Sequence, residues 1–128
     1  MINLRWASGC IAAVALTAAG AAAAQPAPDP ASRRLFLQCQ SCHSVKSGQP
    51  HKVGPNLAGV MGQRAGTRPG YNYSKPLAAS GVIWTDAAMD RWLQKPSAVV
   101  PGNKMVFSGV AKAEDRQKLI AYMRTYAR

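Results

Sequence analysis

Acidic residues are scarce in this sequence. It has 5 Asp or Glu against 16 Lys or Arg, which gives a formal charge of +11. A chain this basic has three common kinds of partner, namely nucleic acid, an anionic membrane or the acidic face of another protein. The basic residues are scattered rather than grouped in runs, which argues against nucleic acid.

Long apolar runs are also lacking beyond the N-terminus, which indicates a soluble body. The first 24 residues are the exception. Arg5 gives a positive start, residues 10–24 are apolar and rich in alanine, and cleavage after Ala24 would satisfy the small-residue rule of secretory signals. The apolar stretch has about 15 residues, whereas a membrane span needs roughly 20. An uncleaved membrane anchor is the alternative to a signal peptide.

The chain of 128 residues is expected to have one folded domain. We predict a signal peptide, a flexible proline-rich arm and a domain at residues 1–24, 25–31 and 32–128. Cleavage would leave 104 residues and lower the charge to +10, because Arg5 is removed. It would also remove Cys10, so that only Cys39 and Cys42 remain. We expect the mature chain to be periplasmic.

No stretch of the mature chain alternates convincingly between apolar and polar residues, as a half-buried strand would. Four segments instead have apolar residues at helical spacing or the residue types of helix ends, namely 32–38, 74–81, 84–95 and 112–126. From 44 to 70 the chain is rich in Gly and Pro and has no period, which indicates loops. The sequence therefore predicts an all-α fold with long loops.

Residue types at the expected helix ends support these boundaries. Ser74 and Thr85 are suited to accept hydrogen bonds from the first backbone N–H groups of a helix. Trp84 and Met89 have the spacing of a hydrophobic staple around the second of these caps. Pro96 is expected to end the helix that Thr85 begins.

Residues 39–43 read Cys-Gln-Ser-Cys-His. Two cysteines at this spacing can each bond to one vinyl group of a haem, and the next residue then lies over one face of the porphyrin, where a ring nitrogen can bind iron. The motif therefore indicates one covalently attached haem c, held by Cys39 and Cys42, with His43 as an axial iron ligand.

Other uses of these residues explain less of the motif. A thioredoxin-like dithiol would need a βαβ context, which is absent from the sequence pattern. A disulfide suits an exported protein but gives His43 no role. A zinc site would need four ligands, and the set Cys39, Cys42, His43 and His51 has poor spacing for one.

The second axial ligand must come from a distant segment. The candidates are His51, Met61, Met89, Met105 and Met123. Met89 and Met123 lie on helical apolar stripes, where a role in the core is expected. Met105 follows a Pro-Gly-Asn-Lys turn that can direct a side chain inward, so spacing favours it, although Met61 in Gly-Val-Met-Gly is harder to exclude.

Five further motifs follow the cysteine motif along the chain. They are Gly-Pro-Asn-Leu at 54–57, Gly-Tyr-Asn-Tyr-Ser at 70–74, Gly-Val-Ile-Trp at 81–84, Pro-Gly-Asn-Lys-Met at 101–105 and Leu-Ile-Ala-Tyr at 119–122. In this order they resemble a class I cytochrome c of the mitochondrial and small bacterial type. The resemblance implies about four to five helices wrapped with long loops around one covalent haem.

The resemblance also implies roles for individual residues. It makes Met105 the distal iron ligand. The Pro55 carbonyl would orient the His43 ring, and Tyr73 and Trp84 would bond a haem propionate. Further residues around the haem would be Trp92 and Asn103.

Some positions depart from the pattern of that family. Ser32 stands where a glycine usually lets the first and last helices cross closely. Trp92 replaces a tyrosine whose hydroxyl commonly points at the methionine sulfur, and Leu77 replaces a frequent asparagine. Gln63 stands where an arginine near the propionates is common, and Arg64 is its neighbour.

The function that these residues imply is one-electron transfer, because an iron with both axial positions filled does not readily bind a substrate. We expect acidic-faced redox partners, such as a quinol–cytochrome c reductase, a terminal oxidase, a reaction centre or a periplasmic dehydrogenase. The candidate docking residues are Lys46, Lys52, Lys104 and Lys112. The chain is expected to be a monomer that binds no nucleic acid. Alternatives are a peroxidase or gas-binding protein in which Met105 is displaced, and a subunit of a larger dehydrogenase.

Export and haem attachment together predict the intact mass of the purified protein. We expect the mass to lack residues 1–24 and to include one haem that survives denaturation, because the thioether bonds to Cys39 and Cys42 are covalent. Mass spectrometry of the holoprotein measures both. A mass that retains residues 1–24 would instead support the membrane anchor.

Overall fold

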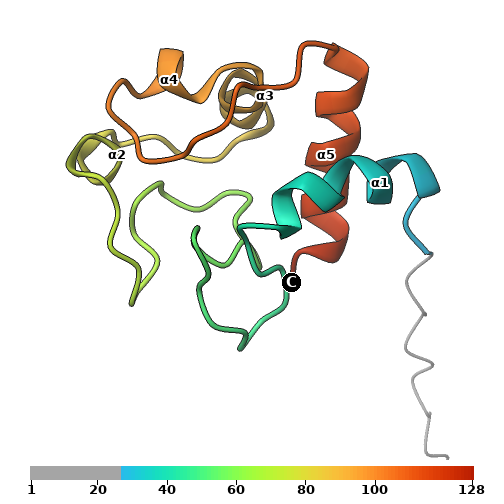
Figure 1. Cartoon of the computed structure of the whole chain (residues 1–128), viewed down its shortest axis with the longest axis horizontal. Helices are drawn as coiled ribbons and strands as arrows, with labels where there is room; N and C mark the ends of the chain where they lie inside the picture. Colours follow the sequence, from blue (N-terminus) through green and yellow to red (C-terminus); the bar gives the residue numbers. More distant parts are fainter. Residues whose placement is uncertain (1–26) are drawn as a thin grey trace, which may run out of the picture.

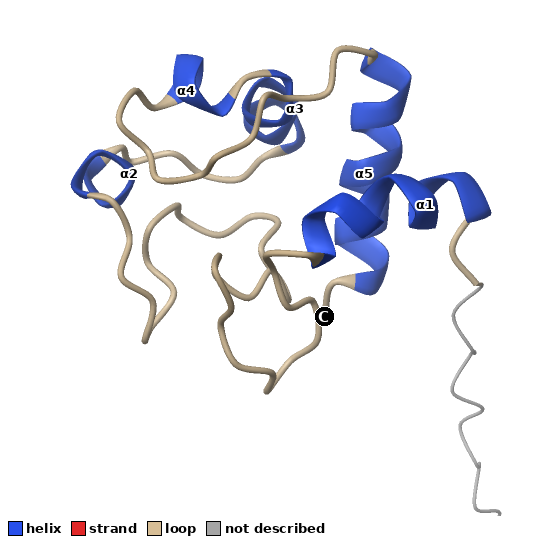
Figure 2. Cartoon of the chain, in the orientation of Figure 1, coloured by secondary structure: helices blue, strands red, loops and turns tan. Residues whose placement is uncertain are grey.

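The computed structural model describes residues 27–128 (Figure 1). Helices are its only regular elements, and Figure 2 shows no strand in this range. The helices are α1 (Pro30–Gln40), α2 (Lys75–Ala79), α3 (Asp86–Gln94), α4 (Pro96–Val99) and α5 (Ala113–Tyr126). The all-α prediction with long loops is confirmed, and the predicted signal peptide at 1–24 lies outside the described residues.

Helix α1 begins before the predicted start at residue 32. The Asp29 carboxylate accepts hydrogen bonds from the backbone N–H and from the hydroxyl of Ser32, each at 2.9 Å, and Pro30 occupies the first turn. The predicted arm at 25–31 therefore does not extend to residue 31. Ser32 is buried, and its hydroxyl is satisfied by the Asp29 cap.

The predicted caps of α2 and α3 are confirmed. The Ser74 hydroxyl accepts from the Leu77 N–H at 3.3 Å, and the Thr85 hydroxyl accepts from the Ala88 N–H at 3.2 Å. Helix α3 ends at Gln94, as the position of Pro96 in the sequence indicated. Helix α4 was not predicted. Proline is suited to the first turn of a helix, so Pro96 both ends α3 and begins α4.

Helices α1 and α5 cross beside each other, although they lie at opposite ends of the domain sequence (Figure 1). At the crossing the rings of Phe36 and Tyr122 stack with centroids 4.3 Å apart, and Phe36 is fully buried. Aromatic pairs bury large apolar areas and favour offset stacking. This crossing fixes the end of α1, where the cysteine motif follows.

The loop over residues 44–70 is held by its own polar groups and by the two residues that follow α5. The Ser47 and Gly59 N–H groups donate to the carbonyls of Arg128 and Ala127 at 2.7 and 2.6 Å. The buried Asn56 amide donates to the carbonyl of Lys46 at 2.8 Å. Side chains and the carbonyls of the two C-terminal residues thus replace the regular pairing that this loop lacks.

The Phe36 contact predicts a test of the helix crossing. Phe36→Ala should lower the free energy of unfolding by roughly 3–5 kcal/mol, because it deletes a buried ring from a close-packed site. Denaturant unfolding of the holoprotein measures the loss. Leu37→Ala is the matched control, since Leu37 is 57% exposed and its loss should change stability by no more than about 0.5 kcal/mol. Equal losses in the two variants would contradict the assignment of the crossing to Phe36.

Candidate cofactor-binding site

A cavity of about 810 Å³ lies at the centre of the described domain. It is lined by side chains from α1, α2, α3 and α5 and by the loops that follow α1, α2 and α4. Close-packed interiors rarely contain voids much larger than a water molecule. The volume is instead in the upper part of the range of ligand pockets, and the lining is mostly apolar.

The cysteine motif forms one wall of this cavity. Cys39 is in the last turn of α1, and the Cys42 and His43 N–H groups both donate to the Cys39 carbonyl, at 3.2 and 2.9 Å. The two thiols and the imidazole therefore line the cavity together. Burial raises the pKa of the Cys39 thiol to about 11, and the neighbouring Cys42 adds to the rise. Redox-active dithiols need a lowered thiol pKa, so this environment disfavours a thioredoxin-like role.

The His43 ring is held on two sides. Its Nδ1 lies 2.7 Å from the Pro55 carbonyl, which can only accept, so Nδ1 carries the proton and Nε2 has a free lone pair. Burial lowers the pKa of His43, which favours the neutral ring, although the Pro55 hydrogen bond acts in the opposite direction. A buried neutral imidazole with one nitrogen bonded and the other free fits an iron ligand.

Gly54 provides the other side of this support. A Cβ atom at Gly54 would lie 2.3 Å from Cε1 of His43 and 2.6 Å from Nδ1, closer than any side chain tolerates. The ring therefore occupies the space that only glycine leaves free. This role of Gly54 was not predicted, although a glycine directly before Pro55 was a visible signal for it.

Three methionines line the cavity, and they differ in their surroundings. Met89 and Met123 are each 4% exposed and lie within the apolar core of α3 and α5. Met105 lies on the segment after α4 and is partly buried. Met61 is not among the lining residues. The sequence left Met61 open beside Met105 as the second iron ligand. Because Met105 lines the cavity and Met61 does not, the structure favours Met105.

The turn before Met105 is built by Asn103. The Asn103 N–H and side-chain amide both donate to the Val100 carbonyl, at 3.2 and 2.8 Å. The Asn103 side-chain oxygen accepts from the Met105 N–H at 2.9 Å. Gly102 has a φ of +79°, as the third position of such a turn requires. Asn103 therefore fixes the backbone from which the Met105 side chain enters the cavity.

Aromatic side chains make up another part of the lining. Trp84 and Trp92 meet edge to face with centroids 5.1 Å apart, and both are buried. Tyr73 meets Tyr71 edge to face at 4.8 Å. Burial raises the pKa of the Tyr73 hydroxyl, so this group stays a hydrogen-bond donor at neutral pH. All of the predicted surrounding residues line the cavity.

Polar residues also line the cavity. Gln63 and Arg64 are among them, and so is Arg68. The Arg68 guanidinium bonds the carbonyl of Ala58 and lines both this cavity and a smaller neighbouring depression. Arg68 was not predicted, because only the folded loop brings it to this wall.

The four candidate docking lysines do not gather in one place. Lys104 lines the cavity, and Lys52 precedes the cavity-lining Val53. Lys46 precedes Ser47, which bonds the chain after the C-terminal end of α5, whereas Lys112 caps the other end of that helix. A helix of 14 residues is about 21 Å long, so these last two lysines are far apart.

The zinc alternative has no support among the described residues, which contain no group of three or more metal-ligating side chains. His51 is used elsewhere. Its Nε2 lies 2.9 Å from the Pro69 carbonyl, and its Nδ1 accepts from the Asn56 N–H at 2.9 Å. Both ring nitrogens are engaged and His51 does not line the cavity, which disfavours it as the second iron ligand.

Comparison with known proteins agrees with this geometry. The family model described as Cytochrome c matches residues 31–127. The chain belongs to the cytochrome c family. It is 42% identical to cytochrome c2 of Rhodomicrobium vannielii over 116 residues, covering 90% of this chain and 93% of that protein. It is also 42% identical to the cytochrome c of Kluyveromyces lactis over 86 residues, covering 67% and 78% of the two chains.

A solved structure supports the same assignment. The fold matches cytochrome cH from Methylobacterium extorquens with a TM-score of 0.71 and 37% identity, over 77% of this chain and 99% of that one. The predicted cytochrome c fold is therefore confirmed. As a cytochrome c, the chain carries a covalently attached haem c and transfers electrons, and nothing in the comparisons favours a peroxidase or a gas-binding protein.

The close approach of Gly54 to His43 predicts the effect of adding one methyl group. Gly54→Ala should displace the imidazole, change the visible spectrum of the haem and lower the free energy of unfolding by roughly 1–3 kcal/mol, as overpacking does. Absorption spectra and denaturant unfolding of the holoprotein measure the two effects.

Gly48→Ala is the matched control for this variant. Gly48 has a φ of +77° and nothing within 4 Å of an added Cβ, so this change strains the backbone without touching His43. It should reduce stability but leave the haem spectrum unchanged. A spectrum that is unchanged in Gly54→Ala as well would show that the glycine does not position the ring.

Proposed function

We propose that this chain is a periplasmic one-electron carrier in which Cys39 and Cys42 attach the haem and His43 and Met105 are its axial ligands. One observation carries the proposal: the cysteine motif and the partly buried Met105 line the same cavity. The free Nε2 of His43 and the Asn103 turn before Met105 support the two ligand assignments.

Each residue has a physical task in this function. Haem c supplies a one-electron couple, and the chain sets its surroundings. The Pro55 carbonyl holds the proton on Nδ1 of His43 and so keeps Nε2 available for the metal. Buried Trp84, Trp92 and Leu93 exclude water from the cavity, which limits the reorganisation that a change of charge there would require.

The periplasmic location follows from the sequence of the first 24 residues. Among the helices in residues 27–128, none is long and apolar enough to cross a bilayer. Residues 1–24 have a positive start, a short apolar stretch and small residues before the expected cleavage site. Cleavage would release the domain as a free carrier.

Docking is proposed at the mouth of the cavity. Lys104 lines the cavity there, and Lys52 adjoins Val53, which is 79% exposed. Val106 is also fully exposed and lines the cavity. The basic rim suits an acidic redox partner such as a reductase, an oxidase, a reaction centre or a dehydrogenase. Lys46 and Lys112 stay candidates of lower rank, because neither lines the cavity.

The docking proposal predicts a graded effect of single lysines. Lys104→Gln should slow electron transfer to an acidic oxidase or reductase at low ionic strength by up to about fivefold, the factor that corresponds to ~1 kcal/mol for one exposed charge. Lys112→Gln is the control. It removes the same charge at a residue that does not line the cavity, so it should have a smaller effect. Stopped-flow kinetics over a range of salt concentrations measure both rates.

Salt should slow the unmodified protein as well, because screening weakens attraction between exposed charges. The difference between the two lysine variants should then disappear at high salt. A rate that does not depend on ionic strength would refute electrostatic docking, and equal effects of both variants would refute its location at the cavity mouth.

A further inference from the structure

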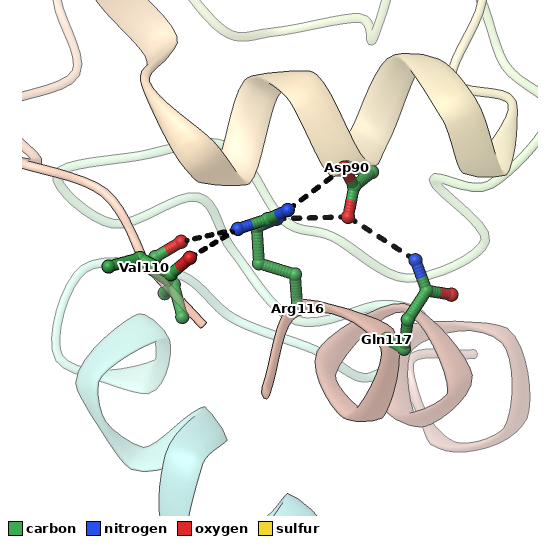
Figure 3. Close-up of polar contacts among 5 residues, drawn as sticks. Asp90, Val110, Arg116 and Gln117 are labelled. Atoms are coloured by element: carbon green, nitrogen blue, oxygen red, sulfur yellow. Dashed lines mark hydrogen bonds and ion pairs between the residues drawn. The ribbon is translucent and has the colours of Figure 1, made fainter. Parts of the chain in front are cut away.

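Arg116 is a buried charged side chain that the proposed electron transfer does not use. It lies in the first turns of α5, is 7% exposed and does not line the cavity. Its guanidinium bonds both carboxylate oxygens of Asp90 on α3, with Nε to Oδ1 at 2.9 Å and Nη2 to Oδ2 at 3.3 Å (Figure 3). Gln117 donates to the same carboxylate at 3.2 Å.

The remaining guanidinium nitrogen of Arg116 bonds the segment between α4 and α5. Nη1 bonds the carbonyls of Val110 and Ala111, at 3.0 and 2.8 Å (Figure 3). These residues end the extended segment that begins at Met105. The guanidinium therefore joins α3, α5 and the segment that carries the proposed distal ligand.

The same end of this segment also contacts the last turn of α3. The Val110 N–H donates to the Leu93 carbonyl at 2.8 Å. A Cβ atom at Gly109 would lie 2.0 Å from the Gln94 carbonyl oxygen, so the backbone here presses directly on the helix. Residues 109–111 are thus one anchor of the segment, and the Asn103 turn is the other.

Between the two anchors the segment has little other support. Met105 and Phe107 are partly buried and line the cavity, whereas Val106 and Ser108 are exposed. In the described part of the chain, no backbone hydrogen bond ties residues 106–109 to another element. The depth at which Met105 enters the cavity therefore depends on where the two ends are held.

We propose that Arg116 is a positioning residue for Met105, because it holds the second anchor of the segment. The proposal rests on the proposed ligation by Met105. A planar guanidinium can bond a carboxylate with two donors and still reach two carbonyls, whereas a lysine ammonium has three donors in a different geometry. Arg116→Lys should keep the charge next to Asp90 but loosen residues 109–111.

A plain ion pair between two helices is the simpler reading of Arg116, and the chain has a matched control for it. Arg124 on α5 bonds Asp86 on α3, so this pair joins the same two helices. It touches no carbonyl of the segment after Met105. The Arg124 side chain is 53% exposed and that of Arg116 is 8% exposed, so the two variants are compared relative to their own losses of unfolding free energy. If Arg116 acts only by joining α3 and α5, Arg124→Lys should have a comparable effect on that relative scale.

The experiment measures how readily Met105 leaves the iron. Imidazole added to the ferric holoprotein competes with the methionine, so its apparent affinity reports the population of the locally open segment. We expect Arg116→Lys to raise this affinity about tenfold and to weaken the long-wavelength absorption band of sulfur-ligated ferric haem. Arg124→Lys should leave both unchanged.

A third variant separates local opening from global destabilisation. Tyr122→Leu weakens the crossing of α1 and α5, and Tyr122 is neither part of the segment nor among the residues that line the cavity. An imidazole affinity that rises as much in Tyr122→Leu as in Arg116→Lys, relative to the loss of unfolding free energy, would overturn the proposal. An affinity that does not change in Arg116→Lys would also overturn it.

If Arg116→Lys does not fold, Asp90→Asn tests the same anchor. This variant should give a smaller rise of the imidazole affinity, and no rise would overturn the proposal.

The unmodified protein tests the underlying ligation separately. A long-wavelength sulfur band in the wild type, together with an unchanged affinity in Arg116→Lys, would refute the role of Arg116 but not the ligation by Met105. The absence of that band in the wild type would refute both.

Discussion

The domain depends on filling one large internal space. A small chain with five helices and long loops has at its centre a cavity of about 810 Å³, which no side chain of its own occupies. An empty space of that size would forfeit the dispersion contacts of its whole lining. The haem is therefore part of the core as well as the redox centre, and residues such as Trp84, Trp92 and Leu119 have both roles at once.

The supports of the two proposed ligands differ in kind. The His43 ring is fixed by short-range contacts, a glycine on one side and a carbonyl on the other, within a loop that also continues from the covalent attachment. Met105 lies on a segment that the local Asn103 turn holds at one end and Arg116 of α5 holds at the other. The support of the methionine therefore includes a contact from a distant part of the chain, which the support of His43 does not.

Local patterns in the sequence predicted most of the helices and the haem attachment. The contacts of Ser74, Thr85 and Pro96 are with residues a few positions away in the chain, so the sequence alone predicted their roles. The cysteine motif has its chemistry in adjacent positions. What the sequence did not indicate depends on contacts across the fold: Arg116 meets Asp90 only when α3 and α5 pack together, and Gly54 meets His43 only when the loop returns. Helix α4 is too short to show a period.

The crossing of α1 and α5 has a consequence for how the family can vary. The two ends of the domain meet each other, and the Ser47 and Gly59 N–H groups tie the long loop to the C-terminal residues at two points. Loop closure costs little more as a loop grows, about 0.6 kcal/mol for each doubling of its length. Chain added between these ties would therefore extend outward and leave the helix pair intact. The same framework can accept insertions in its loops while the ends that frame the cofactor stay constant.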